Sequence, residues 1–142
     1  MGKAVAITGM GVASAAGCDV ASFWNNVRAG LSGCRATIAT GDNTPASAFE
    51  AAVDDAELAR AVELWGVRKN ERVVKLAAVA CHQAWHDAGL PKPALPTLGS
   101  RAGIILGSGL GGIQFLEEQM WRVLKSANNR IHPHSVPRVS PT

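Results

Sequence analysis

The sequence predicts an α/β fold with a parallel β-sheet, because apolar runs typical of buried strands alternate along the chain with segments of helical period. Residues 4–8 form a short apolar run that ends at a glycine turn. Residues 71–88 carry apolar side chains around most of a helix. A β-branched run over residues 102–106 is joined by a glycine-rich turn to an amphipathic segment over residues 113–125. The expected order is strand, helices, strand, helix.

Length and composition indicate one globular domain. The chain has 142 residues, of which 47% are hydrophobic and only 18% are charged. Its net charge of +3 and its lack of a dense Lys/Arg run argue against a dedicated nucleic-acid binder, because such proteins neutralise many phosphates at once. An acidic protein partner is compatible with this charge.

The cysteines indicate a reducing compartment. Cys18, Cys34 and Cys81 are odd in number and have no C-x-x-C spacing, so neither a disulfide framework nor a zinc ribbon is predicted. No apolar run has the length of a membrane span, and the glycine at position 9 comes too early for a signal-peptide core. We therefore expect a cytoplasmic protein without a membrane partner.

After the first strand, the sequence predicts two short helices with a loop between them. Asp19 is a suitable N-cap for the first helix, and Gly30 is placed to end it. The region 31–53 has no sustained period and reads as mostly loop, with room for one short strand. A second helix follows Asp54, and Gly66 is placed to end it. Apolar residues recur at helical spacing in both, at Val20, Phe23, Trp24 and Val27 and then at Leu58, Ala59, Val62 and Trp65.

The segment 71–88 is the strongest helix prediction, and Gly89 is placed to end it. A helix that is apolar around most of its circumference is expected to be buried. Three prolines within residues 91–96 then form a stiff connection to the strand at 102–106.

A last helix is expected from Ile113 to Lys125, with Glu118 and Arg122 able to pair one turn apart. Two strands are too few to form a protected parallel sheet. We therefore expect the domain to continue beyond the chain or to be completed by another chain. The side chains that this last helix is predicted to bury are Ile113, Leu116, Met120, Val123 and Leu124.

The glycine turn over residues 107–112 has two competing interpretations, a cradle for nucleotide phosphates and the rim of an acyl pocket. Its glycines leave room for positive φ angles or for close approach of a ligand. Gly107, Gly109 and Gly112 have the spacing of a dinucleotide-binding fingerprint. The acidic residue that should bind ribose about twenty residues later is missing, and residues 127–130 stand in its place.

Other candidate sites have simpler explanations. His82 and His86 lie one helical turn apart, but no third metal ligand is evident, so an exposed helix edge is favoured. Ser108 lacks the Gly-x-Ser-x-Gly frame of a nucleophile elbow.

The basic residues Arg68, Lys69 and Arg72 precede or begin the 71–88 helix, where cations oppose the helix dipole. They therefore form either a solvated surface or a binding patch.

Taken together, the ordered motifs resemble the N-terminal part of β-ketoacyl-acyl-carrier-protein synthases, the condensing enzymes of fatty-acid and polyketide synthesis. The resemblance extends along the whole chain. The motifs that carry it are the opening VAITGMG at 5–11, Phe23-Trp24, Ala29-Gly30, Ser32-Gly33, RKNER at 68–72, DAGL at 87–90 and GSGLGG at 107–112.

The resemblance implies a thiolase-like fold with α/β/α/β/α layers, of which residues 1–142 form an N-terminal segment. It places Leu110, with its neighbours Gly109 and Gly111, at an acyl pocket, where the size of residue 110 helps to set the accepted chain length.

The resemblance also places basic side chains against the acidic helix of the acyl carrier protein. Arg68 and Lys69 occupy two of these positions, and Arg138 is the third candidate. This assignment of Arg138 matches the family's Pro-Arg-x-x-Ser-Pro-like tail to residues 137–141, and the alternative match is to residues 130–133.

The implied activity is decarboxylative Claisen condensation of an acyl thioester with malonyl-carrier protein, by a homodimer that needs no metal or nucleotide cofactor. The nucleophilic cysteine and the two histidines of the family come later than this segment, so no catalytic residue is assigned to this chain. One alternative is a non-catalytic chain-length-factor type subunit, and another is a nucleotide-binding Rossmann-type domain.

Overall fold

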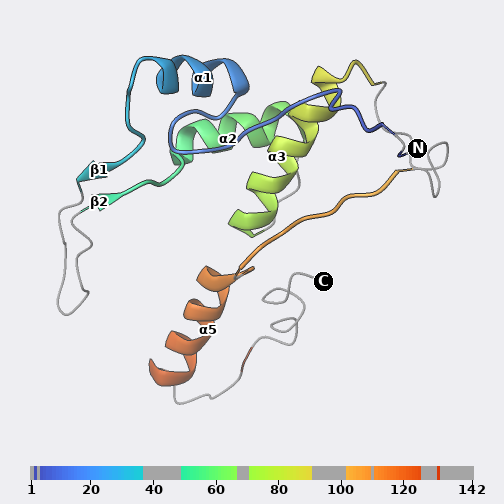
Figure 1. The fold of residues 1–142 in the computed structure, drawn as a ribbon. Helices are drawn as coiled ribbons and strands as arrows, with labels where there is room; N and C mark the ends of the chain where they lie inside the picture. Colours follow the sequence, from blue (N-terminus) through green and yellow to red (C-terminus); the bar gives the residue numbers. More distant parts are fainter. Residues whose placement is uncertain are drawn as a thin grey trace. The chain divides into compact units, whose positions relative to one another are not determined.

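The structure is a computed structural model that describes residues 2, 4–36, 49–66, 71–90, 102–109, 111–125 and 131. The chain divides into two compact units. The first consists of Met1–Arg68 and Leu76–Pro93, and the second of Lys69–Lys75 and Ala94–Thr142. The predicted proline connection and the tail after Lys125, except Ile131, lie outside the described residues. The elements are α1 (Val20–Arg28), β1 (Arg35–Ala36), β2 (Phe49–Glu50), α2 (Asp55–Leu64), α3 (Arg72–Asp87) and α5 (Ile113–Lys125), labelled in Figure 1.

Local capping interactions set the ends of α1 and α2. The Asp19 side chain accepts a 2.9 Å hydrogen bond from the Ser22 backbone N–H, and Asp54 caps α2 through the N–H groups of Ala56 and Glu57. Gly30 and Gly66 follow the two helices with φ angles of 67° and 63°, which glycine adopts without steric cost. Both predicted helices are confirmed, with their caps.

The region 31–53 was predicted as a loop with room for one strand, but its described residues include two strands. β1 and β2 pair antiparallel, with Arg35 opposite Glu50 and Ala36 opposite Phe49. The Arg35 guanidinium Nε lies 3.0 Å from a Glu50 carboxylate oxygen, so opposite charges meet across the pair. The sequence prediction was wrong here because two-residue strands are too short to show an alternating pattern.

The helix predicted over 71–88 is confirmed as α3, and Gly89 follows it with a φ of 65°. Its predicted burial is wrong for the described part of the structure. Val79 is its buried residue, most of its other side chains are half-buried, and Val74 is 42% exposed. A helix that is apolar on several sides needs neighbours on several sides to be buried. The contacts of α3 include those with Trp65 at the end of α2 and with Met10 and Val12 of the N-terminal segment.

The predicted parallel sheet is not formed among the described residues, so it stays a prediction. Residues 4–13 and 102–109 are assigned to no strand. A strand requires backbone hydrogen bonds to a neighbouring strand. An apolar run without such a neighbour forms no strand, and its side chains remain exposed to solvent. Val5 is 94% exposed and Ile104 is 80% exposed. The described fold is therefore a mixed α/β arrangement with one two-stranded antiparallel sheet.

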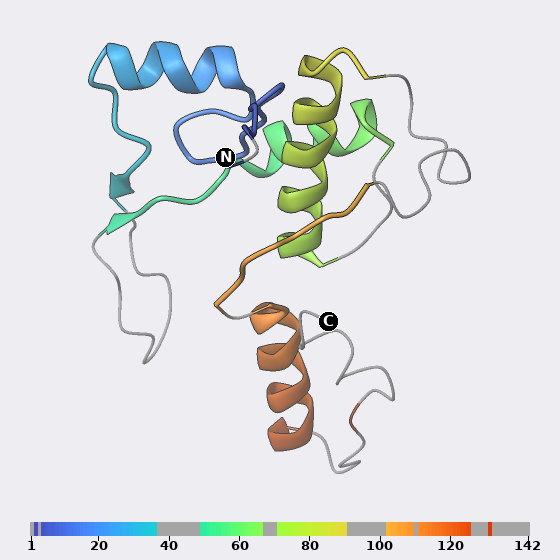
Figure 2. The same ribbon diagram turned by 45° about the vertical axis from the view of Figure 1, so that its right-hand side comes forward.

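In the first unit, two glycines let the N-terminal segment lie directly against α3. In Figure 2, α2 passes behind this helix and crosses it. A Cβ added at Gly11 would lie 2.8 Å from the Ala84 backbone nitrogen and would overlap the Ala80 carbonyl oxygen. A Cβ at Gly9 would lie 2.6 Å from the Ala88 backbone nitrogen. Real side chains do not tolerate such distances, so close packing requires glycine at both positions.

In the second unit, α5 has the predicted bounds but buries a different face. Phe115 and Gln119, one turn apart, are 6% and 3% exposed. Of the five side chains that the sequence predicted as buried, Leu116 and Val123 are half-buried, while Ile113, Met120 and Leu124 are exposed. No helix in the described ranges is long and apolar enough to cross a membrane.

Candidate functional site

The glycine turn ends where α5 begins, as predicted. The Gly111 carbonyl oxygen accepts a 3.0 Å hydrogen bond from the Ile113 N–H, and the Gly112 carbonyl oxygen accepts one of 3.0 Å from the Leu116 N–H. Gly111 is half-buried and Gly112 is buried, so the turn is fixed against the helix at this end. The turn therefore changes an extended segment into a helix within a few residues.

The other end of the turn is open. A Cβ added at Gly109 would meet no atom within 4 Å, and the same holds at Gly107. The glycines with positive φ in the described residues are Gly17, Gly30, Gly66 and Gly89, none of them in the turn. Neither strain nor close packing within the described chain explains Gly107 and Gly109. The backbone of both glycines is exposed on the side where a Cβ would lie.

Four of the six residues predicted to bind an acyl chain or a carrier protein lie outside the described residues: Leu110, Arg68, Lys69 and Arg138. The remaining two are Gly109, which is exposed, and Gly111, which is half-buried beside the start of α5. The position of the Leu110 side chain and the binding role of all six residues stay predictions.

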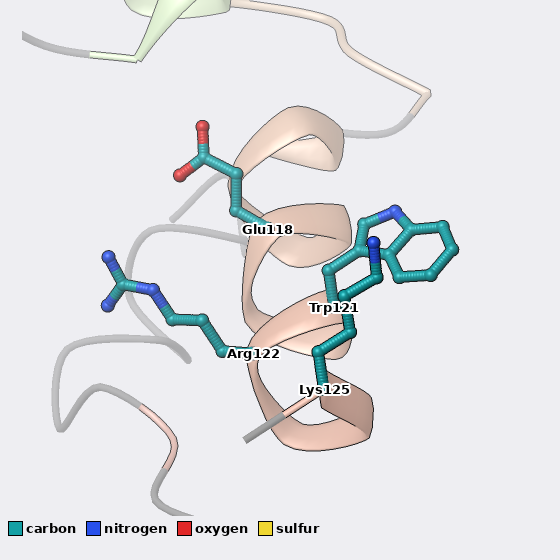
Figure 3. Close-up of a pocket in the computed structure, with 4 residues that line it drawn as sticks. All are labelled: Glu118, Trp121, Arg122 and Lys125. Atoms are coloured by element: carbon teal, nitrogen blue, oxygen red, sulfur yellow. The ribbon is translucent and has the colours of Figure 1, made fainter. Parts of the chain in front are cut away.

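The sequence analysis missed a shallow hollow on α5. Its volume is about 490 Å³, and its described lining consists of Glu118, Trp121, Arg122 and Lys125. Figure 3 shows Glu118 and Arg122 on one side of the helix and Trp121 and Lys125 on the other. The signal in the sequence was the spacing of these residues, which recur at one and two helical turns.

Two charged side chains of this hollow behave differently from the prediction. Glu118 and Arg122 form no ion pair with each other, which corrects the expectation of an i, i+4 salt bridge. The Lys125 ammonium instead lies 4.5 Å from the centre of the Trp121 ring. This cation–π contact holds both side chains against the last turn of α5.

Cys18 is the buried cysteine of the first unit, and its pKa is raised. Burial is the main cause, the nearby Glu57 carboxylate adds to it, and together they raise the pKa of the Cys18 thiol to about 11. At neutral pH this side chain is a protonated thiol, the opposite of an activated nucleophile. Cys34 and Cys81 are exposed and form no disulfide.

The two histidines of α3 pack on a tryptophan. The Trp65 ring is stacked on His82 with ring centres 5.9 Å apart, and it meets His86 edge to face at 5.6 Å. The described residues contain no group of three or more side chains that could hold a metal ion. His86 is exposed, as expected for an exposed helix edge, whereas His82 is half-buried, and both rings help to join the end of α2 to α3.

Comparison with known proteins gives a match along nearly the whole chain. The family model described as "Beta-ketoacyl synthase, N-terminal domain" matches residues 2–141. Among curated relatives, 3-oxoacyl-[acyl-carrier-protein] synthase 2 of Coxiella burnetii is 32% identical over 95% of this chain and 32% of its own length.

Two further relatives are similar to the chain at comparable levels. The chloroplastic 3-oxoacyl-[acyl-carrier-protein] synthase I of Arabidopsis thaliana is 31% identical over 95% of this chain and 29% of its own length. The synthase 2 of Staphylococcus aureus is 30% identical over 98% of this chain and 33% of its own length. The chain thus spans about a third of the length of these relatives.

Proposed function

Because the chain belongs to the β-ketoacyl synthase family, whose N-terminal-domain model matches residues 2–141, we propose that it forms the N-terminal part of a condensing enzyme. The complete protein joins an acyl thioester to malonyl-carrier protein by decarboxylative Claisen condensation, in fatty-acid or polyketide synthesis. This proposal rests on the match of the family model to residues 2–141, together with relatives named as 3-oxoacyl-[acyl-carrier-protein] synthases.

The role of this chain in the reaction is to shape the acyl pocket. In the proposal, Leu110 projects from the glycine turn toward the acyl chain, and the bare backbone of its neighbour Gly109 leaves the approach open. A larger or smaller side chain at position 110 changes how many methylene groups can be buried. Each buried methylene contributes about 0.8 kcal/mol, so chain length is selected by binding energy.

The second role is to receive the carrier protein. Arg68, Lys69 and Arg138 supply positive charge for its acidic helix, and the chain's net charge of +3 favours the encounter. Such charge pairs mainly raise the association rate and depend on salt. A homodimer, a cytoplasmic location and the absence of a metal or nucleotide cofactor belong to the same proposal.

The layered thiolase-like fold also belongs to the proposal. The described structure supports it through two apolar extended segments, 4–8 and 102–106, which have no strand partner among the described residues. Ile105 is fully exposed, which is costly for a β-branched apolar side chain. In the layered fold these segments pair with further strands, and the domain extends beyond residues 1–142.

In this proposal the catalytic groups of the reaction lie in the remaining part of the enzyme. The buried Cys18 of this chain has the raised pKa of a structural thiol, so we assign the nucleophilic cysteine and the two histidines to that remaining part.

The test uses the complete protein that contains this chain, with acyl-carrier protein and malonyl-carrier protein as substrates. We expect release of carbon dioxide and formation of a 3-oxoacyl product. Leu110→Phe should shift the preference to shorter acyl chains and Leu110→Ala to longer ones, while Leu64→Phe, a control at an exposed position of α2, leaves the preference unchanged.

A protein that binds the acyl chain without condensing it would instead be the chain-length-factor type subunit. Binding of NAD(P) with release of measurable heat in calorimetry would favour the Rossmann-type alternative and contradict the proposal.

A further inference from the structure

We draw no further inference here: the strongest candidate, the side-chain cluster of Trp65, His82 and His86 between the end of α2 and α3, belongs to the helix packing already described, and the described residues supply no third group with which the two histidines could hold a metal ion.

Discussion

The side-chain amide of Gln83 donates a 2.6 Å hydrogen bond to the carbonyl oxygen of Cys18, the residue before the N-cap of α1. The oxygen of the same amide accepts a 2.9 Å bond from the Val12 N–H, and one turn later the Asp87 carboxylate accepts from the Met10 N–H at 2.9 Å. One face of α3 thus satisfies three backbone groups of the N-terminal segment. These side chains of α3 make hydrogen bonds with the backbone of the segment, as a neighbouring strand would do in a sheet.

Replacing Gln83 by leucine should destabilise the chain by about 2 kcal/mol, because two part-buried backbone groups lose their partner while the side-chain volume is nearly kept. The measurement is urea unfolding followed by circular dichroism. Gln114→Leu is the matched control at an exposed position of α5 and should change the free energy of unfolding by less than about 0.5 kcal/mol. Equal effects of the two variants would contradict the assigned role of Gln83.

Gly11→Ala should cost at least about 2 kcal/mol, since the new methyl group would overlap the backbone of α3. Gly103→Ala is the control, because a Cβ at Gly103 meets nothing within 4 Å and the residue has no positive φ. Hydrogen exchange of the α3 amides should speed up in the first variant and stay unchanged in the second. A neutral Gly11→Ala would show that residues 4–13 do not pack on α3 in solution.

Alkylation should distinguish Cys18 from the exposed cysteines. With a pKa of about 11, Cys18 near pH 9 has about fiftyfold less thiolate than an ordinary thiol, so iodoacetamide should react with it more slowly by at least that factor. The comparison uses the double variants C34A/C81A and C18A/C81A, which leave Cys18 or Cys34 as the single cysteine. Denaturation in urea should make the two rates equal.

The raised pKa of the Cys18 thiol also makes the free energy of unfolding depend on pH. The folded chain holds the Cys18 proton more tightly than the unfolded chain, in which the thiol has its ordinary pKa of 9.0. The stabilisation is therefore complete below pH 9 and is lost as the pH rises toward 11. Cys18→Ala should remove this alkaline decline in the melting temperature.

Asp19, the N-cap of α1, should give a pH dependence of stability with the opposite sign. Hydrogen bonds from the Ser22 backbone N–H and hydroxyl lower the pKa of the Asp19 carboxyl. The stabilisation by this cap is present above the usual pKa of aspartate and is lost as the pH falls through the lowered value. Asp19→Ala should cost about 1 kcal/mol at neutral pH. Asp19→Asn should keep most of that stability, but the stability should no longer fall as the pH is lowered. Melting temperatures measured at several pH values would show this difference.

The helices were predictable because their ends depend on neighbouring residues. Asp19 and Gly30 define α1 through a cap and a left-handed glycine, and Asp54 and Gly66 do the same for α2. The buried face of α5 was not predictable, because helical spacing gives a period but does not say which side meets a neighbour. Phe115 and Gln119 are buried there, although a polar glutamine would not be expected inside.

The strands and the candidate site depend on more distant partners. The runs at 4–8 and 102–106 have the amino-acid composition of strands. A strand also needs a neighbouring strand to pair with, and the composition of one segment does not identify that neighbour. The turn from Gly107 to Gly112 was predictable from its glycines, whereas the role of Leu110 came only from a family resemblance and stays a prediction. The hollow beside Trp121 could be anticipated only from the spacing of its lining residues along α5.

The contact of Gly11 with α3 also limits how mutational damage can be repaired. The atoms that would obstruct a methyl group there include the Ala80 carbonyl oxygen and the Ala84 nitrogen, which every amino acid at those positions retains. No replacement of Ala80 or Ala84 can therefore act as a second-site suppressor of Gly11→Ala by creating room. A genetic screen for revertants should return glycine itself at position 11, or changes that move the entire N-terminal segment.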